Sequence, residues 1–319
     1  MPAMDPHTLP AGGGAACPPR RRLITLVVGL AVLAGCGAPA GGTRGSALGD
    51  DAITIGSFDF PESELLAELY AQALERAGIR VIRDLDIGPR ELVMPALQSG
   101  LLEVVPEYEG SALGFLGGHP SADAPAEHDA LLATLRDRGL TALKPARAED
   151  RNAFVVTART ADRLGVRSLS DLHSDAIDLR FGGPPECQDR PLCLGGLRDR
   201  YGLRFASFVP LDAGGPVTVQ ALREGFVDVG LLFSTAAALH GNEFVELVDD
   251  RRLEPVERVV PVIEDELVAR FGQSATEALD AVSATITTAG LREMNAELES
   301  GTSVADVASA WLTDHPSTG

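Results

Sequence analysis

Apolar residues follow two spacings along the chain, and both indicate regular secondary structure. Residues 52–58 alternate between apolar and polar as a strand does, and residues 61–77 carry apolar side chains at helical spacing until Gly78. The same analysis predicts a second strand, a second helix and a third strand at residues 79–85, 91–99 and 102–105. Strands that alternate with helices predict an α/β fold with a largely parallel sheet.

A short pattern occurs twice. Residues 96–104 read ALQSGLLEV and residues 221–229 read ALREGFVDV, so each copy predicts a helix end, a glycine stop and a buried strand. An aromatic residue, Tyr108 or Phe233, stands twelve positions after the first alanine of each copy. Ligands of open α/β sheets bind beyond the carboxyl ends of the strands. The repeat therefore predicts two lobes whose equivalent strand ends face each other.

The lobe boundaries follow from two apolar segments, residues 152–158 and 256–263, which we interpret as the crossings between the lobes. Lobe one is then expected at residues 51–148 together with 257–319, and lobe two at residues 149–256. The C-terminal part of lobe one is expected to be mainly helical, with helices at residues 265–271, 275–289 and 304–312.

The first 36 residues differ from the rest of the chain. Arg20, Arg21 and Arg22 precede the apolar run 23–34, which is too short for a bilayer core that needs about 20 residues. Its length and flanks are typical of a signal peptide, here residues 1–35. The following Leu-Ala-Gly-Cys resembles a lipobox, and this predicts a lipid anchor on Cys36 at the extracytoplasmic face of the cell membrane. An ordinary cleavage site beside a chance cysteine is the alternative.

Residues 36–50 follow this anchor and are small, polar and rich in glycine, which is typical of a flexible tether. Beyond it the chain is strongly acidic. The whole sequence has 27 basic and 46 acidic residues. Without residues 1–35 it has 24 basic and 45 acidic residues, a net charge of −21. Because nucleic-acid binders need clustered positive charge, this composition argues against a nucleic-acid partner.

The four cysteines are assigned from their positions. Cys17 leaves with the signal peptide and Cys36 takes the lipid, which leaves Cys187 and Cys193 in the segment PPECQDRPLCL. An exported chain meets an oxidising environment, so we expect these two to form a disulfide. The spacing is not CxxC and no histidine lies beside it, so no metal site is expected there.

Enzyme signatures are scarce in this sequence. It contains no GxSxG, no P-loop, no HExxH and no GxGxxG, and its histidines are scattered without metal-ligand spacing. We therefore expect neither an enzyme nor a bound cofactor or metal, although an enzyme on a two-lobed scaffold stays an alternative.

Four segments in order resemble the solute-binding proteins of osmoprotectant ABC importers. They are ITIGSFDFPESELLAELYAQALERAG, PALQSGLLEVVPEYEGSALGFL, FGGPPECQDRPLCLGGLRDRYGL and ALREGFVDVGLLFSTAAAL. That family takes glycine betaine, choline, carnitine and related quaternary amines. The resemblance covers residues 52–312 and implies the two-lobed periplasmic-binding-protein fold of type II, which closes on its ligand by a hinge. It also implies a small-molecule solute as ligand and ABC permease and ATPase subunits as partners.

The family binds trimethylammonium groups in a cage of tyrosines from both lobes, because aromatic faces attract cations. Carried over to this chain, the cage positions fall at Tyr108 and Phe233 and near Asn152 and Val256. The resemblance assigns Arg190 to a ligand carboxylate and Ser111 to a hydroxyl contact. A Lys or Gln that often follows the first Gly-Ser in the family is replaced by Phe58, and we include its neighbour Asp59 among the candidates.

The cage is depleted in this chain, since only Tyr108 and Phe233 are aromatic at matching positions, with Phe58 as a third candidate ring. A larger, less cationic or more apolar ligand fits this change better than a compact trimethylammonium. Each of these rings could instead be core packing. A binder of another small metabolite and a tethered ligand sensor stay open as alternatives.

Overall fold

The structure, a computed structural model, describes residues 51–316. The predicted signal peptide, the lipid on Cys36 and the tether lie outside the described residues. Within residues 51–316, no helix is both long enough and apolar enough to cross a bilayer.

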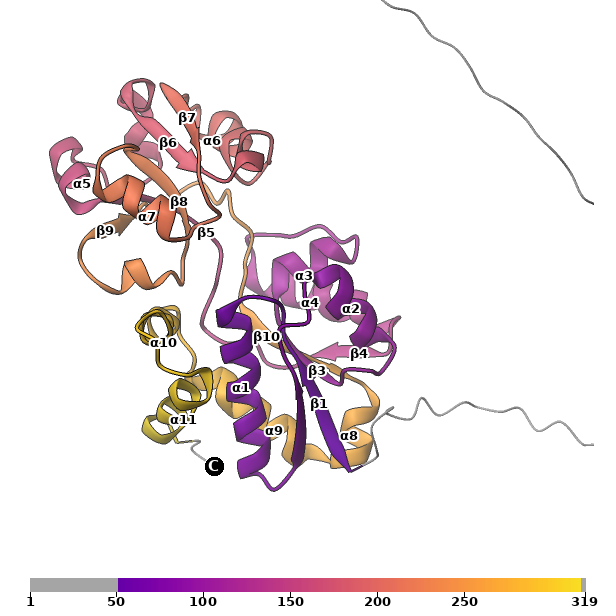
Figure 1. Cartoon of the computed structure of the whole chain (residues 1–319). Helices are drawn as coiled ribbons and strands as arrows, with labels where there is room; N and C mark the ends of the chain where they lie inside the picture. Colours follow the sequence, from indigo (N-terminus) through magenta and orange to yellow (C-terminus); the bar gives the residue numbers. More distant parts are fainter. Residues whose placement is uncertain (1–50, 317–319) are drawn as a thin grey trace, which may run out of the picture. The chain divides into compact units, whose positions relative to one another are not determined.

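The first of two five-stranded sheets has the order β2-β1-β3-β10-β4 (Figure 1). Its strands are β1 (Ala52–Gly56), β2 (Arg80–Asp84), β3 (Val104–Tyr108), β4 (Leu140–Ala142) and β10 (Val259–Glu264). The helices between its first four strands are α1 (Pro61–Arg76), α2 (Arg90–Gln98), α3 (Glu109–Phe115) and α4 (Ala124–Arg136). We call this sheet and its helices, together with the C-terminal helices, lobe one.

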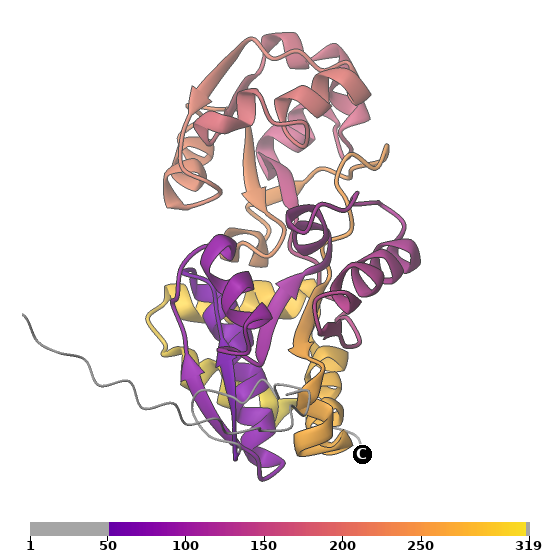
Figure 2. The same cartoon turned by 90° about the vertical axis from the view of Figure 1, so that its right-hand side faces the viewer.

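The second sheet has the order β7-β6-β8-β5-β9, and with its helices it forms lobe two. Its strands are β5 (Asn152–Thr157), β6 (Arg180–Gly183), β7 (Ser207–Pro210), β8 (Val229–Phe233) and β9 (Phe244–Glu246). Its α-helices are α5 (Ala158–Leu164), α6 (Leu194–Tyr201) and α7 (Pro216–Arg223). Short 3₁₀ helices are η1 (Ser170–Ser174), η2 (Ala176–Asp178), η3 (Pro185–Gln188) and η4 (Ala237–His240). The two sheets are separate in both views (Figures 1 and 2).

The expectation of a largely parallel sheet was wrong for both lobes, because each sheet is mixed. β2, β1 and β3 are parallel, but β10 runs antiparallel to β3, and β4 runs antiparallel to β10. Lobe two repeats this arrangement, with β5 antiparallel to β8. The reason is topological: β5 and β10 enter their sheets from the other lobe, and therefore start at the edge where the parallel strands end.

The internal repeat has the structure that its pattern predicts. In lobe one, α2 ends before Gly100 (φ +75°) and the chain then enters β3; in lobe two, α7 ends before Gly225 (φ +69°) and the chain enters β8. A residue with a β-carbon avoids such positive φ values, which is why glycine stands at both stops. Tyr108 and Phe233 are the last residues of β3 and β8, so they occupy equivalent strand ends.

The C-terminal helices differ from their prediction. They are α8 (Glu266–Phe271), α9 (Gln273–Thr285), α10 (Thr288–Glu299) and α11 (Val304–Asp314). The single helix expected at residues 275–289 was wrong, because Ile286 is extended (ψ 127°) and separates α9 from α10. The hydroxyl of Thr287 accepts a hydrogen bond from the N–H of Gly290 and caps α10, so a new helix begins there.

Two chain segments, residues 143–151 and 247–258, connect the lobes and pair with each other. The apolar segments predicted as the crossings, residues 152–158 and 256–263, instead lie largely in β5 and β10, which directly follow these connections. The N–H of Asp150 donates to the carbonyl of Glu257 at 3.0 Å, and the N–H of Val259 donates to the carbonyl of Ala148 at 3.0 Å. Glu149 and Arg258 form an antiparallel bridge between them. The pairing holds the two connections side by side. Any movement of one lobe against the other must therefore bend both connections at this place.

Candidate ligand-binding cleft

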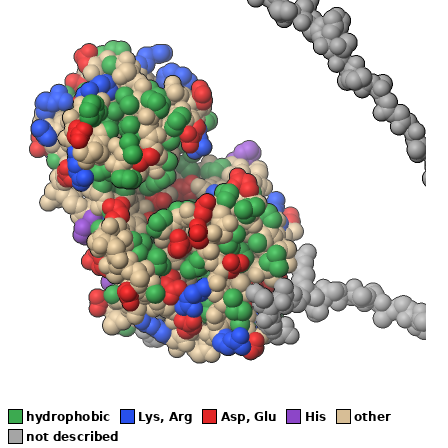
Figure 3. Space-filling view, in the orientation of Figure 1, with side chains coloured by type: hydrophobic (Ala, Val, Ile, Leu, Met, Phe, Trp, Pro, Cys, Tyr) green, Lys and Arg blue, Asp and Glu red, His purple; other side chains and the backbone are tan. Residues whose placement is uncertain are grey.

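A cleft of about 340 Å³ lies beside the paired connections and is lined by residues of both lobes. Lobe one contributes Ser111 near the start of α3, and lobe two contributes the end of β8 and the loop that follows β6. The connecting segments supply the rest of the wall. Figure 3 shows acidic side chains along the hollow between the lobes. The cleft therefore lies at the carboxyl end of a parallel strand, the usual place for a ligand in such sheets.

Four of the predicted ligand residues line this cleft: Ser111, Asn152, Arg190 and Phe233. Phe233 is 39% exposed at the end of β8, which leaves part of its ring open to a ligand. The side-chain amide of Asn152 donates to the carbonyl of Leu192 at 3.2 Å. The structure brings these four residues together, and their roles in ligand binding stay predictions.

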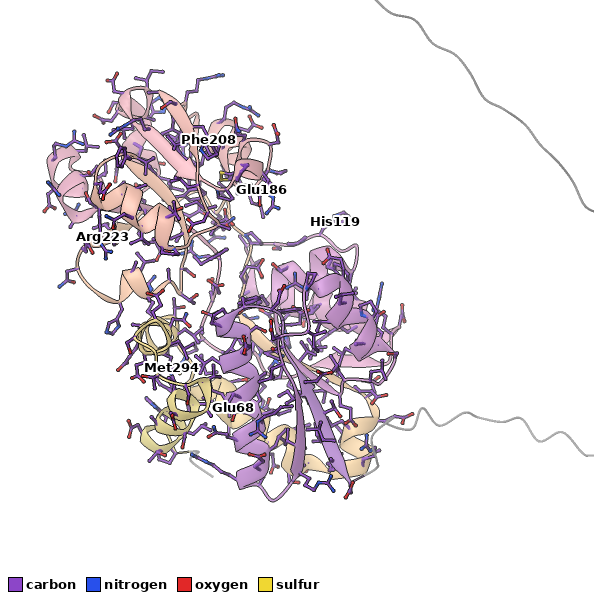
Figure 4. The ribbon with its side chains drawn as sticks, viewed as in Figure 1. Glu68, His119, Glu186, Phe208, Arg223 and Met294 are labelled. Atoms are coloured by element: carbon purple, nitrogen blue, oxygen red, sulfur yellow. A yellow bond between two sulfur atoms is a disulfide. The ribbon has the colours of Figure 1, made fainter. Side chains whose placement is uncertain are left out.

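The loop that carries Arg190 is closed by a disulfide between Cys187 and Cys193, as predicted. Both cysteines are buried, and the N–H of Cys193 donates to the carbonyl of Arg190 at 3.1 Å. The Arg190 guanidinium lies 3.6 Å from the carboxylate of Glu186, which belongs to η3 (Figure 4). Both partners are largely exposed, so this ion pair is weak and leaves the guanidinium free to meet another carboxylate.

Two predicted aromatic residues lie in the core of lobe one instead. Tyr108 is 5% exposed, its hydroxyl donates to Oε1 of Glu62 at 2.8 Å, and its ring stacks on Phe60 with 6.2 Å between the ring centroids. Phe58 is buried and also stacks on Phe60, with 5.8 Å between the ring centroids. The guanidinium of Arg90 lies 5.0 Å from the centre of the Phe58 ring. Neither Tyr108 nor Phe58 is among the residues that line the cleft.

Asp59 and Val256 also lie away from the cleft wall. The side chain of Asp59 is exposed to solvent before α1. Val256 is buried, and it acts through its backbone: its carbonyl accepts from the N–H of Gly110 at 3.1 Å, and its N–H donates to the carbonyl of Ser121 at 2.9 Å. Val256 thereby ties the second connection to lobe one.

Three carboxylates that the sequence analysis did not select line the cleft: Asp150, Glu254 and Glu257. Asp150 accepts from the hydroxyl of Thr235 at 2.8 Å. Glu257 accepts from both the N–H (3.0 Å) and the hydroxyl (2.9 Å) of Ser111. Among the described residues, no group of three acidic, histidine or cysteine side chains is arranged to hold a metal ion.

Burial makes these carboxylic acids hard to ionise. Desolvation raises the pKa of Asp150 well above its ordinary value, and the nearby charge of Glu62 adds to the shift. Desolvation raises the pKa of Glu257 to about 7, although the hydrogen bonds from Ser111 favour the ionised form. Desolvation likewise raises the pKa of Glu254 to about 8. A cation in the cleft would stabilise the ionised forms of all three groups.

A largely buried hydrogen-bond network connects the two strand ends and reaches Asp150 at the cleft. Glu62 accepts from Tyr108 through Oε1, and through Oε2 from the side-chain amide of Asn295 at 2.7 Å. The same amide of Asn295, in α10, donates to the carbonyl of Thr235 at 2.9 Å. Thr235 in turn donates to Asp150. The network therefore joins the end of β3 in lobe one to the loop after β8 in lobe two.

Arg151 also lines the cleft, but its charge is largely matched by other carboxylates. Its guanidinium lies 3.0 Å from Glu246 and 3.8 Å from Glu149. Arg292 of α10 binds Glu246 at 2.5 Å and also donates to the carbonyl of Ser234 at 2.6 Å. Arg151 is thus held toward β9, which leaves Arg190 as the more available guanidinium at the cleft.

A local signal for two of the missed carboxylates exists in the sequence. Glu254 and Glu257 bracket Pro255 and Val256 at the start of the apolar run 256–263. Charged residues are rarely buried unless they have partners, so acids at the edge of an apolar crossing are candidates for a site. Their burial could not be read from the sequence, because it depends on Ser111 and Asn152 from distant segments.

A family sequence profile matches residues 51–314, and it describes the substrate-binding domain of ABC-type glycine betaine transport systems. A glycine-betaine-binding protein of Pseudomonas aeruginosa is 28% identical over 262 residues, which are 78% of this chain and 83% of the relative. The glycine betaine-binding protein YehZ of Escherichia coli is 23% identical over 258 residues, 77% of this chain and 84% of the relative.

The fold is shared with a solved structure described as a glycine betaine/carnitine/choline ABC transporter. The TM-score is 0.77 at 24% sequence identity, and the match covers 82% of this chain and 98% of that chain. The two-lobed α/β architecture predicted from the sequence is therefore confirmed as the periplasmic-binding-protein fold of type II.

Proposed function

Because this chain belongs to the family of substrate-binding domains of ABC-type glycine betaine transport systems, we propose that its cleft captures a small quaternary-amine-like osmoprotectant of the glycine betaine and choline type. One observation carries this proposal: the cleft combines an exposed aromatic ring, Phe233, with buried carboxylates such as Glu254 and with the guanidinium of Arg190. Ring and carboxylates suit an organic cation, and the guanidinium suits an anionic tail.

The recognition mechanism follows from these chemical types. A trimethylammonium group has no N–H, so it is held by aromatic faces and by opposite charge; such a ring is worth about 0.5–2 kcal/mol. Phe233 supplies the ring, and Asn152 and Ser111 supply polar edges to the cleft. A carboxylate on the ligand would pair with Arg190, whose present partner Glu186 is exposed and 3.6 Å away.

Closure of the lobes on the ligand would occur at the paired connections. We place lobe one at residues 51–148 and 257–319 and lobe two at residues 149–256. Both connections then pass between the lobes at the same place, and both must bend when the lobes close. A ligand that touches Ser111 and Phe233 at once contacts both lobes, and it therefore favours the closed form by its differential contacts.

We further propose that the mature protein is anchored by a lipid on Cys36 at the extracytoplasmic face of the cell membrane, and that it delivers its solute to an ABC permease with its ATPase. The basic and apolar leader before Leu-Ala-Gly-Cys supports the anchor. Cys36→Ser should release the protein from membranes or leave it unprocessed. Unchanged mass and membrane partition in that variant would count against the anchor.

The ligand assignment is tested by thermal-shift screening of the purified protein, followed by calorimetry. Glycine betaine, choline and carnitine form the first set of ligands, and amino acids and sugars form the second. Stabilisation by the first set alone is the expected result, since bound ligand raises the melting temperature by mass action. Stabilisation by the second set alone would favour the alternative of another small metabolite. A cleft to which the described residues contribute one aromatic ring, that of Phe233, also allows this alternative.

A further inference from the structure

Glu254 has a carboxylate oxygen without a partner. The residue is 6% exposed and lines the cleft, and no hydrogen bond reaches its Oε1 from the described residues. Its other oxygen accepts from the side-chain amide of Asn152 at 3.1 Å, which fixes the orientation of the carboxylate. A buried carboxyl oxygen left unpaired is unfavourable, so the position favours a ligand that brings a donor to the ionised group.

Among the described residues, no cation lies at hydrogen-bonding distance from the carboxylate of Glu254. Its own N–H donates to Asp249 at 2.8 Å, so a second carboxylate lies close by. The charges of Asp249 and Glu257 oppose ionisation of Glu254, while Arg151 and the Asn152 hydrogen bond favour it. Arg151 is itself bound to Glu246. The charge that Glu254 gains on ionisation is therefore not matched by a directly paired cation among the described residues, and it suits a positive ligand group.

We propose that Glu254 forms a hydrogen-bond-accepting cation subsite, so that within the class of small organic cations this cleft prefers amines that retain an N–H over fully methylated ones. This inference rests on the proposed function, because it assumes that an organic cation occupies the cleft. An N⁺–H···O⁻ contact is charge-assisted and short, whereas a trimethylammonium presents only methyl groups to the same oxygen. Each methyl removed from the ligand nitrogen creates a possible donor for Oε1.

Proton release accompanies binding in this arrangement. In the empty cleft, desolvation raises the pKa of Glu254 to about 8, so the group is mostly protonated at pH 7. A bound cation favours the ionised form and lowers this pKa, and the proton leaves to the solvent. Affinity for a permanent cation such as choline should therefore rise with pH until the empty site is itself ionised. Glu257, whose pKa is about 7, and Asp150 line the same cleft and contribute to this linkage.

The test is calorimetry at pH 7 with ethanolamine, its N-methyl and N,N-dimethyl derivatives, and choline, which share one skeleton. The wild-type protein should bind the N–H-bearing members about tenfold or more tightly than choline, the ratio expected for one charge-assisted hydrogen bond. Glu254→Gln should remove this preference, because the amide nitrogen that replaces one oxygen cannot accept. The variant keeps the shape of the side chain and an oxygen for Asn152, so it should remain folded.

Glu257→Gln is the matched control, since both oxygens of Glu257 are already bound by Ser111. It should weaken all four ligands by a similar factor and keep their order. For the wild type, calorimetry in two buffers of different ionisation enthalpy should show proton release on choline binding, without the need for any variant. Glu254→Gln should reduce that release.

Each outcome separates the two proposals. If the affinity of the wild type falls with every methyl group removed, or if Glu254→Gln preserves the preference, the Glu254 subsite is wrong while the proposed function stands. If Glu257→Gln abolishes the preference as strongly as Glu254→Gln does, the assignment of the subsite to Glu254 is wrong. If neither this series nor glycine betaine and carnitine bind at all, the proposed function fails and this inference fails with it.

Discussion

The hydroxyl of Tyr108 donates a hydrogen bond to Oε1 of Glu62 at 2.8 Å. Both residues are buried, and burial raises the pKa of each: that of Tyr108 well above its ordinary value, and that of Glu62 above 4.5. The aromatic residue that the family pattern assigns to a ligand cage is thus bound within its own lobe. Its position at the end of β3 is the one expected, and its contacts are those of a network that reaches lobe two through Asn295.

Tyr108→Phe should therefore lower stability more than affinity. The change leaves Oε1 of buried Glu62 without its donor, which costs about 1–3 kcal/mol in the free energy of unfolding. Denaturant unfolding of the purified protein measures this loss. Tyr70→Phe is the control, since Tyr70 is equally buried but its hydroxyl meets the neutral Ser283 at 2.9 Å, so a smaller loss is expected. Lost binding with unchanged stability in Tyr108→Phe would instead place the hydroxyl against the ligand.

Phe233→Ala should weaken binding with little effect on the fold. The side chain is 39% exposed at the cleft, so its removal costs the cation–aromatic attraction of about 0.5–2 kcal/mol and little core packing. Phe226→Ala is the matched control in the same lobe, because Phe226 is 62% exposed and does not line the cleft. Calorimetry with the ligand found by thermal shift measures the affinity of each variant. If Phe233→Ala and Phe226→Ala change the affinity equally, Phe233 is not part of the binding site.

Arg190→Ala should discriminate between ligands with and without a carboxylate. A guanidinium pairs with a carboxylate and has no comparable partner in choline, so glycine betaine should lose about tenfold or more in affinity, and choline should lose little. Arg198→Ala, an exposed arginine of α6 that pairs with its neighbour Asp199, serves as the control. If both ligands weaken equally, Arg190 acts through the shape of its loop.

Loss of the disulfide should reduce both stability and affinity. The bond between Cys187 and Cys193 closes a loop with a sequence separation of 6, and this constraint on the unfolded chain contributes about 2 kcal/mol. The double variant Cys187→Ser, Cys193→Ser should unfold at a lower temperature and bind a carboxylate ligand less tightly, because Arg190 lies within the loop. Two reactive thiols at these positions in the unreduced protein would contradict the bond.

Stability should fall as the pH rises through neutrality. Glu257 has an unfolded-state pKa near 4.5 and a folded-state pKa of about 7, so the folded state binds its proton more tightly. That contribution favours folding at low pH and is lost between about pH 4.5 and pH 7, by roughly 1–3 kcal/mol. Urea unfolding between pH 5 and pH 8 measures it, and Glu257→Gln should reduce the slope of the profile, with Glu254 and Asp150 contributing the remainder. A wild-type profile that rises over this range would contradict the assignment.

Much of the local structure was predictable because it depends on neighbouring residues. Pro61 begins α1, and Gly100 and Gly225 stop the chain before β3 and β8, as the periodicity and glycine positions indicate. The break between α9 and α10 was missed, because residues 275–289 keep helical spacing across it. It depends on the extended backbone of Ile286 and the Thr287 cap, and short-range apolar periodicity is a weak guide to such boundaries.

The cleft was only partly predictable for a related reason. The repeat and the family pattern identified Phe233, Arg190, Asn152 and Ser111, because these positions are tied to local motifs. They could not show that the tyrosine of the first repeat lies in the core, since Phe58 and Phe60 come from another part of lobe one.

The amino-acid sequence predicted the first strands and helices of lobe one, the doubled α/β plan, the pairing of Cys187 with Cys193 and the family. Which strands run antiparallel, and which polar groups become buried together, depended on the tertiary structure. The carboxylate of Glu254 meets Asn152 across a separation of 102 residues, and Glu257 meets Ser111 across 146. Patterns along a chain report contacts within a few residues, whereas desolvation, and the raised pKa values that follow from it, depends on every atom that folding brings near the group.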